Sequence, residues 1–296
     1  MSKEENTRIR LWLKIVPLLI VVSLFGWCSS NNRKAQQLGP LKMELVNLFQ
    51  EHGLVDGSND RNSLESVAKA AGESTMNGML YEMASSGSVD ALKWLVAHGA
   101  DPKNVGAQKD MTLLQATALH PRLDRLEYML GFGLDPLERS RDGRNMLHYA
   151  AQGGLDPAVL KLLISKGLKV SDADNAGRLP MHFASLKSIG VLVGAGAEID
   201  ATDDAGMTPL AQAAKEGRND AVAELLRNSA SVFAKDKKGR TPLHHAAMSQ
   251  KSEAVIETLR AAGAPVTARD DEGLTPKELG LDSRDNSRYR SALDKL

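Results

Sequence analysis

The 296-residue sequence contains a single cysteine, Cys28, and few aromatic residues, which make up 4% of the chain. One thiol cannot form a disulfide within the chain, so other interactions must stabilise the fold. Because Phe, Trp and Tyr are scarce, Leu and Ala must supply most of the hydrophobic core. Such a composition is usual for short stacked helices.

The chain also lacks a net charge, since 37 Lys and Arg residues balance 37 Asp and Glu residues. Nonspecific attraction to nucleic acid is therefore disfavoured. No Gly-rich phosphate loop precedes a helix, no cysteine–histidine pair is available, and the carboxylate pairs Asp203-Asp204 and Asp270-Asp271 fall in turns. We therefore expect neither catalytic residues nor a metal or cofactor, and no enzyme.

A seven-residue pattern recurs along the chain, clearest at 208–214 and 241–247, where it begins Thr-Pro-Leu. The third place of successive copies steps by 34, 33, 34, 29, 33 and 34 residues. A period of about 33 residues with a Thr-Pro-Leu-His-x-Ala core is typical of a helix-turn-helix repeat joined by β-turn fingers. The residues in that place are Leu80, Leu114, Leu147, Met181, Leu210, Leu243 and Lys277.

Five copies carry recognisable motifs, the two above and those at 112–115, 145–148 and 179–182. On these motifs, residues from about Asn77 to Leu281 closely resemble the ankyrin repeat. The resemblance implies an all-α solenoid of paired helices with β-turn fingers, about six to seven repeats including degenerate caps. It also implies that His148, His182 and His244 bond to backbone between repeats and are not zinc ligands.

The copy that begins at Thr241 shows why the motif has these residues. Gly239 permits a positive φ in the finger, Thr241 can cap a helix, and Pro242 is tolerated in the first turn. No copy can bury its apolar face alone, so stacking of neighbours must supply the stability.

The 29-residue step between Met181 and Leu210 departs from the period. Residues 185–189 replace the longer inter-helix turn that 215–220 provides in the next copy, which must shorten a helix or pinch the turn. One interpretation is neutral drift in a loop. The other is a bend in the stack that creates a notch on the concave face, fitted to a partner.

The N-terminus has an organisation of its own. Arg8 and Arg10 precede an apolar run at 11–27. Lys14 and Pro17 interrupt this run and shorten its uninterrupted apolar stretch to the length of a signal-peptide core. We predict a signal peptide or membrane anchor at 1–28, a polar tether at 29–40, an N-terminal helical cap at 41–76, ankyrin repeats at 77–281 and a C-terminal cap at 282–296. Within the cap, 63–71 is expected to be a separate short helix.

Cys28 follows this apolar run and precedes a Ser/Asn-rich stretch, a position that resembles the lipid-modified cysteine of bacterial lipoproteins. Trp27 departs from the small residue which that family prefers before the cysteine; the alternative is a cysteine that merely ends an anchor. If Cys28 is lipidated, Ser29 resembles the outer-membrane sorting pattern. The expected location is then the periplasmic side of a bacterial envelope, with inner-membrane anchoring as the alternative.

Partners of ankyrin repeats usually contact finger tips and the solvent side of the first helices. The residue just before each helix start defines an Arg/Met stripe: Met111, Arg144, Arg178, Met207, Arg240 and Leu274. Arg pairs with carboxylates and an exposed Met adapts to apolar surfaces. The fingers add charges to this predicted protein-binding surface, basic at Lys237 and Lys238 and acidic at Asp172, Asp174, Asp200, Asp203 and Asp204. The alternative is that each charge only aids solubility.

Two functions follow. The layout resembles bacterial ankyrin-repeat lipoproteins, some of which are immunity proteins that block secreted toxins, including phospholipases. An envelope-anchored protein, monomeric when free, that neutralises such a toxin or lipase is therefore the most specific expectation. The alternative is a cytoplasm-facing membrane scaffold or a host-directed effector, anchored by 11–27.

Overall fold

The computed structural model describes Leu45 and residues 64–105, 111–120, 122–154, 156–249 and 253–282, with the side chain of Leu45 and those from residue 73 onward. Several predicted segments lie outside the described residues. These are the leader with Cys28, the tether, the N-terminal cap up to residue 63 apart from Leu45, and residues 283–296 of the C-terminal cap. The chain divides into two compact units, Met1–Ala71 and Gly72–Leu296. The second unit contains the repeats.

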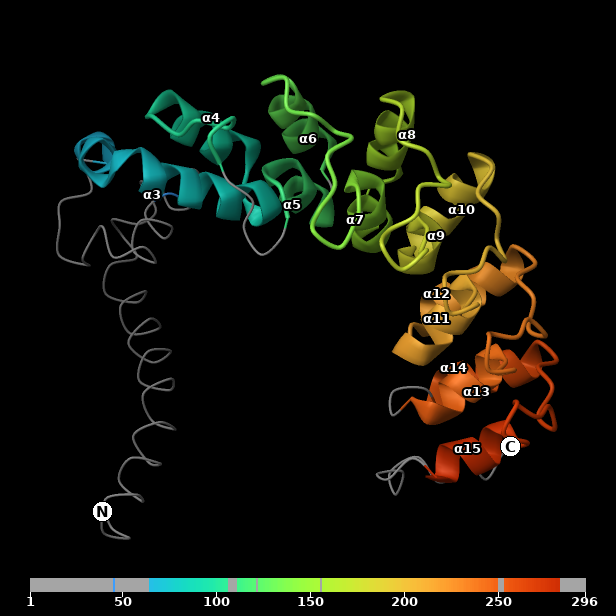
Figure 1. Cartoon of the computed structure of the whole chain (residues 1–296). Coiled ribbons are helices and arrows are strands. Elements are labelled where there is room, and N and C mark those ends of the chain that lie inside the picture. Colours follow the sequence, from blue (N-terminus) through green and yellow to red (C-terminus); the bar gives the residue numbers. More distant parts are fainter. Residues whose placement is uncertain are drawn as a thin grey trace, which may run out of the picture. The chain divides into compact units, whose positions relative to one another are not determined.

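Every regular element in the described part of the chain is a helix, and the helices alternate between two rows (Figure 1). After α3 (Leu64–Ser86), the inner row holds the helices that begin at the motif, and the outer row holds their partners. The inner helices are α5 (Leu113–Leu119), α7 (Met146–Gly153), α9 (Pro180–Phe183), α11 (Pro209–Glu216), α13 (Pro242–Met248) and α15 (Pro276–Asp282). The outer helices are α4 (Val89–Ala97), α6 (Leu123–Leu130), α8 (Pro157–Ser165), α10 (Leu186–Gly194), α12 (Asn219–Arg227) and α14 (Glu253–Ala261).

Each inner helix contacts the next inner helix, and each outer helix contacts the next outer helix. The core between the rows consists of buried Leu, Met, Val, Ile and Ala side chains, such as Leu147, Leu210 and Leu243 in the third motif place. This arrangement is the predicted all-α solenoid of paired helices. The expected separate helix at 63–71 is wrong, because α3 continues from Leu64 to Ser86 without a break.

The motif residues start the inner helices as predicted. The Thr208 hydroxyl accepts a hydrogen bond from the Ala211 N–H at 3.2 Å, and Asn145 Oδ1 accepts one from the Leu147 N–H at 3.1 Å. These bonds satisfy N–H groups that have no partner within the helix. The Pro that follows Thr208 occupies the first turn, where its missing N–H costs nothing.

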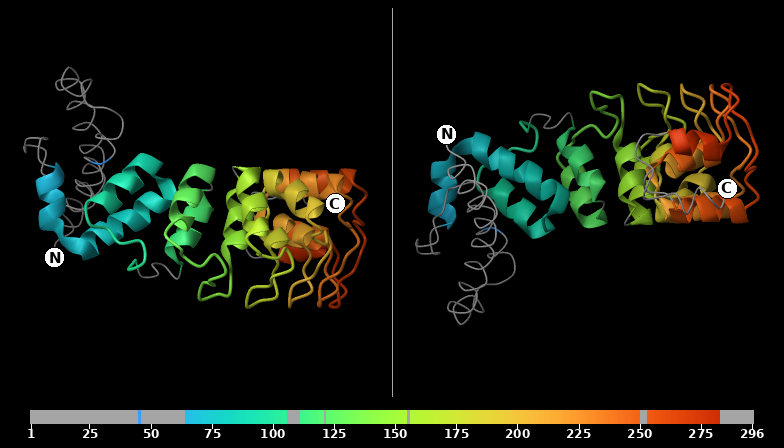
Figure 2. Two further views of the ribbon diagram at one scale, coloured as in Figure 1. Left: turned by 90° about the horizontal axis from the view of Figure 1, so that it is seen from above. Right: turned by 90° about the horizontal axis from the view of Figure 1, so that it is seen from below.

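The fingers lie side by side along one edge of the stack (Figure 2) and are joined by backbone hydrogen bonds. The N–H groups of Asn175, Asp204, Lys237 and Asp271 donate to a carbonyl of the preceding finger, each at 3.0 Å. Gly206 shows why glycine is required beside this ladder. Its φ is +79°, and a Cβ there would lie 2.8 Å from the Lys237 nitrogen. The finger turn therefore needs glycine both for its backbone angle and for the next finger.

An acidic residue organises each of four fingers from within. One carboxylate oxygen accepts the N–H groups of the second and fourth residues that follow, at distances between 2.8 and 3.0 Å. The four are Asp174, Asp203, Asp236 and Asp270. These bonds hold the turn within each finger, in addition to the backbone bonds between fingers.

The motif histidines bridge consecutive repeats, as the resemblance implied. In each, Nδ1 accepts the N–H of the residue three places earlier, so Nε2 carries the proton and donates to a carbonyl of the next repeat. His148 donates to Arg178 at 3.1 Å, His182 to Met207 at 3.0 Å and His244 to Leu274 at 3.1 Å. The structural role predicted for these histidines is confirmed.

Candidate partner-binding site

The shortest inner helix lies where the 29-residue step falls in the sequence. Helix α9 has four residues, whereas α7 before it and α11 after it each have eight. The chain leaves the helix at Ala184, whose ψ is 133°, and the Ser185 N–H donates to the Ala151 carbonyl at 3.0 Å. The sequence allowed two outcomes, a shorter helix or a pinched turn, and the structure has the shorter helix.

A pocket with a volume of about 660 Å³ lies beside this short helix. Its walls come from the start and end of α7, from α9 with the residues around it, and from the turn between α11 and α12. We call it the α9 pocket; it is lined by Arg144, Gln152, Arg178, Phe183, Ser185, Leu186, Glu216, Gly217, Arg218, Asn219, Asp220 and Ala221. The pocket coincides with the inner-helix turn that α9 lacks.

Arg218 reaches across from the next repeat and caps the C-terminal end of α9. Its Nη2 donates to the His182 carbonyl at 2.8 Å and its Nη1 to the Ala184 carbonyl at 2.7 Å. A cation here satisfies carbonyls that have no partner within the helix and opposes the negative end of the helix dipole. Glu216 Oε2 accepts from Arg218 Nε at 2.6 Å and fixes the guanidinium. Sequence patterns did not identify Arg218.

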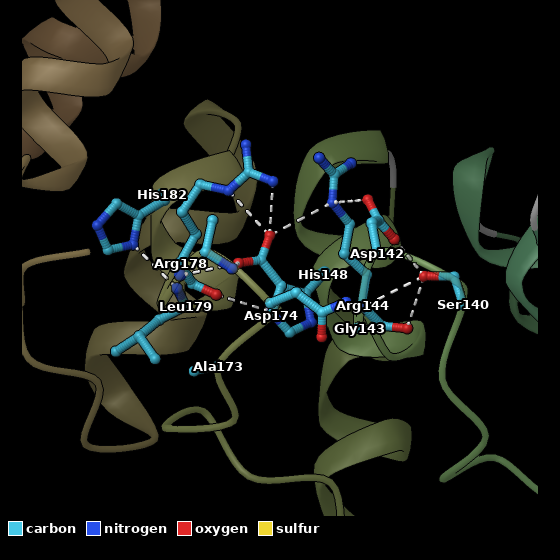
Figure 3. A network of polar contacts seen from close by, with 12 residues as sticks. Ser140, Asp142, Gly143, Arg144, His148, Ala173, Asp174, Arg178, Leu179 and His182 are labelled. Atoms are coloured by element: carbon cyan, nitrogen blue, oxygen red, sulfur yellow. Dashed lines mark hydrogen bonds and ion pairs between the residues drawn. The ribbon is translucent and has the colours of Figure 1, made fainter. Parts of the chain in front are cut away.

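Two arginines of the Arg/Met stripe meet at one buried carboxylate (Figure 3). Arg178 approaches Asp174 Oδ2 with Nε at 2.8 Å and Nη2 at 2.7 Å, and Arg144 Nε lies 3.7 Å from the same oxygen. Arg144 Nε is also 2.9 Å from Asp142 Oδ2 without hydrogen-bond geometry, so that contact is an ion pair. Burial raises the pKa of Asp174, but hydrogen bonds from Arg178 and from backbone N–H groups outweigh it and lower that pKa below its usual value.

The same two guanidinium groups lie over the ring of Phe183, the last residue of α9. The central carbon of Arg144 is 4.2 Å from the ring centroid, and that of Arg178 is 4.9 Å away. Such cation–π contacts favour a fixed orientation of the cation. Arg144 and Arg178 are therefore positioned at the pocket before any partner arrives.

The structure separates the other predicted stripe residues from this pair. Arg240 lies 3.4 Å from Asp270 and 3.7 Å from Glu272, in a later finger, and does not line the α9 pocket. Met111 and Leu274 are half-buried, and the Leu274 carbonyl accepts the bond from His244.

The prediction that Met207 is an exposed contact residue is wrong. Only 7% of it is accessible. Its N–H donates to Asp203 Oδ1 at 2.9 Å and its carbonyl accepts from His182 Nε2 at 3.0 Å. This backbone is held between two repeats, which places the residue inside the stack.

The predicted finger charges also divide into two kinds. Lys237, Lys238 and Asp204 have exposed side chains, outside the α9 pocket. Asp174 and Asp203 are buried because they accept the finger N–H groups, so the prediction that they belong to an acidic outer surface is wrong.

Among the described residues, no group of His, Cys, Asp and Glu is arranged to hold a metal ion. No helix in this part of the chain is long and apolar enough to cross a membrane.

Paired helices stacked in two rows, finger loops joined by backbone bonds and a side chain that bridges consecutive repeats define a helical-repeat binding scaffold. The chain belongs to the ankyrin-repeat family. The family model for ankyrin repeats in three copies matches residues 79–174, 113–203 and 186–270. A protein–protein interaction role follows from this membership.

Three curated proteins are similar in sequence to part of this chain. It is 24% identical to Palmitoyltransferase AKR1 of Lachancea kluyveri over 187 residues, which are 61% of this chain and 24% of that protein. It is 29% identical to Ankyrin repeat protein nuc-2 of Neurospora crassa over 172 residues, 53% of this chain and 16% of that protein. It is 33% identical to Protein PhlB of Serratia liquefaciens over 115 residues, 37% of this chain and 50% of that protein. The chain thus spans half or less of each relative.

Proposed function

We propose that the protein is a non-enzymatic binding protein that takes one protein partner on the face formed by its inner helices and fingers. The observation that carries this proposal is the α9 pocket with its pair of fixed arginines. Arg144 and Arg178 are held by Asp174 and Phe183, so little side-chain entropy is lost when a partner binds. Such fixed Arg and aromatic groups are typical of binding hot spots.

The finer proposal is an exported, envelope-anchored immunity protein that neutralises a secreted toxin such as a phospholipase. Its support lies in the sequence, in the apolar run at 11–27 followed by Cys28. The similarity to a protein of the bacterium Serratia liquefaciens is compatible with a bacterial setting. Protease treatment of spheroplasts tests the topology: repeats outside the cytoplasm are digested, whereas repeats of a cytoplasm-facing scaffold are protected.

Affinity capture tests the binding function itself. The full-length chain, tagged at its C-terminus, is produced in its native cells and recovered with its partners, which mass spectrometry identifies. The comparison variant Arg144→Glu reverses a charge in the α9 pocket, and the matched control Arg227→Glu reverses an exposed charge on the outer helix α12. We expect one dominant protein that Arg144→Glu loses and Arg227→Glu retains. Equal recovery by all three forms would contradict the proposed face.

Deletion of the gene tests the proposed immunity function against a secreted toxin. Cells without the protein should be inhibited by sibling cells that secrete the captured partner, and the intact gene should restore growth. If the deleted strain competes as well as its parent, the immunity role is wrong even where a binding partner exists.

A further inference from the structure

We propose that the α9 pocket receives an acidic side chain of the partner, Asp or Glu, next to an apolar residue of the same segment. This inference rests on the proposed function, since it specifies the chemistry of the protein that the pocket binds. The acidic side chain would bind at the Arg144 and Arg178 end, and the apolar residue would lie against Leu186.

Arg144 and Arg178 bring hydrogen-bond donors to the α9 pocket. The terminal nitrogens of Arg144 and Nη1 of Arg178 form no hydrogen bond with any residue that the structure describes. In Figure 3 these atoms point away from Asp174, to the same side of the network, while Asp142 and Asp174 lie toward the Nε edges. Two adjacent guanidinium groups with free donor edges match the paired oxygens of a carboxylate.

The α9 pocket also has an apolar surface. Leu186, the first residue of α10, is 43% exposed and lines the pocket. The other large hydrophobic side chains that are exposed in the described part, Leu137, Phe233 and Leu281, do not line it. An apolar partner residue would cover Leu186 and strengthen the hydrogen bonds nearby by excluding water.

The carboxylates of the pocket lining determine the direction of the bound segment. Glu216 and Asp220 line the pocket from the turn between α11 and α12, where Glu216 is already paired with Arg218 at 2.6 Å. A second carboxylate would be repelled there, so the acidic residue must bind at the finger end. Asp142 and Asp174 balance the two arginine charges, so recognition rests on directed donors more than on net charge. A neutral amide at the same place is the competing occupant.

The test uses the full-length chain in detergent micelles and defined peptides. An array of blocked octapeptides places Glu one to three residues from Leu or Phe, and each peptide is paired with its Glu→Gln form and its apolar→Ser form. Because both peptide ends are blocked, only a side chain can supply the carboxylate. Binding of the best peptides is then measured by fluorescence anisotropy.

The variant Arg144→Gln replaces the guanidinium with a neutral amide, Leu186→Trp fills the pocket, and Arg227→Gln is the control outside it. We expect Glu peptides to bind about tenfold more tightly than Gln peptides, a preference that both pocket variants abolish and the control keeps. Circular dichroism melting checks that each variant is folded. Equal binding of Glu and Gln peptides, or no binding by any peptide, overturns the inference.

The same variants in native cells keep this failure distinct from failure of the proposed function. A partner captured equally by the wild type and by Arg144→Gln leaves the protein-binding function in place and overturns the acidic contact. Capture of no partner by either form contradicts the proposed function, while the peptide preference still decides the chemistry of the pocket.

Discussion

The buried imidazole of His148 is a stability element that depends on pH. It bridges its own helix start and the Arg178 carbonyl, and burial lowers its pKa from 6.5 to about 4. The folded protein therefore binds fewer protons than the unfolded chain between these values, and stability is lost as the pH falls from about 6.5 toward 4. The maximum loss at this one site is about 3 kcal/mol.

Gln115 indicates how to remove that dependence. It occupies the same motif place in an earlier repeat, where Oε1 accepts the Thr112 N–H at 2.9 Å and Nε2 donates to the Arg144 carbonyl at 3.3 Å. We predict that His148→Gln retains most of the stability at pH 7 and loses less between pH 6.5 and 4. His148→Ala, the control, should be less stable than the wild type at pH 7 and at pH 4, because it loses the hydrogen bonds to the Asn145 N–H and the Arg178 carbonyl. Urea unfolding across this pH range measures both.

Arg178 and Arg144 should differ in their effect on stability, although both line the α9 pocket. Arg178 pairs through two nitrogens with the buried Asp174, whereas the nearest ion pair of Arg144 is with the half-exposed Asp142. We predict that Arg178→Gln costs about 1–3 kcal/mol, because it leaves a buried carboxylate under-paired, and that Arg144→Gln costs less. Thermal melting of the two variants at pH 7 tests this, and equal melting temperatures would contradict the assignment.

At the scale of helices, the inner starts and the outer partners followed from the repeat period. Thr208 and Thr241 mark helix starts by local chemistry, and the 29-residue step marked the short inner helix. The break expected near Ala71 did not occur, because no proline interrupts α3. Arg218 escaped prediction because its carbonyl partners on α9 lie 34 to 36 residues away, beyond any local pattern.

Arg218 should be the residue on which α9 depends. Its side chain is 27% exposed and donates to the His182 and Ala184 carbonyls, whereas Arg227 on α12 is 66% exposed and, among the described residues, pairs with Glu224 alone. We predict that Arg218→Ala lowers the free energy of unfolding by about 2 kcal/mol and that Arg227→Ala changes it by less than about 1 kcal/mol. Urea denaturation of both variants is the measurement. Similar losses for the two would show that Arg218 does not cap the helix.

At the scale of the whole stack of repeats, stability comes from contacts between neighbouring repeats. The finger ladder and the histidine bridges each join one repeat to the next, so a break at one finger should weaken one interface first. The sequence indicated nearest-neighbour stacking, but the backbone ladder could not be predicted from it. The ladder pairs residues of different repeats, such as Lys237 with Ala205, which no local sequence pattern matches.

Gly206 is the position that tests this coupling. A methyl group there would lie 2.8 Å from the Lys237 nitrogen, whose N–H donates to the Ala205 carbonyl at 3.0 Å. We predict that Gly206→Ala lowers the free energy of unfolding by more than 1 kcal/mol, by about the cost of a strained positive φ plus one lost bond. Gly190→Ala is the matched control, because Gly190 lies inside α10 with nothing within 4 Å of its Cβ, and should raise stability by about 0.5–1 kcal/mol.

Hydrogen exchange of backbone amides then locates the damage from Gly206→Ala. Loss of protection should concentrate at the Lys237 amide and the neighbouring finger amides, while Asn175, two fingers earlier in the ladder, should keep its protection. This follows because each repeat contacts only its neighbours, so local opening need not spread along the stack. Uniform loss of protection from α5 to α15 would instead mean that the repeats unfold as one cooperative unit, and the interface between these fingers could not be treated as a separate contribution to stability.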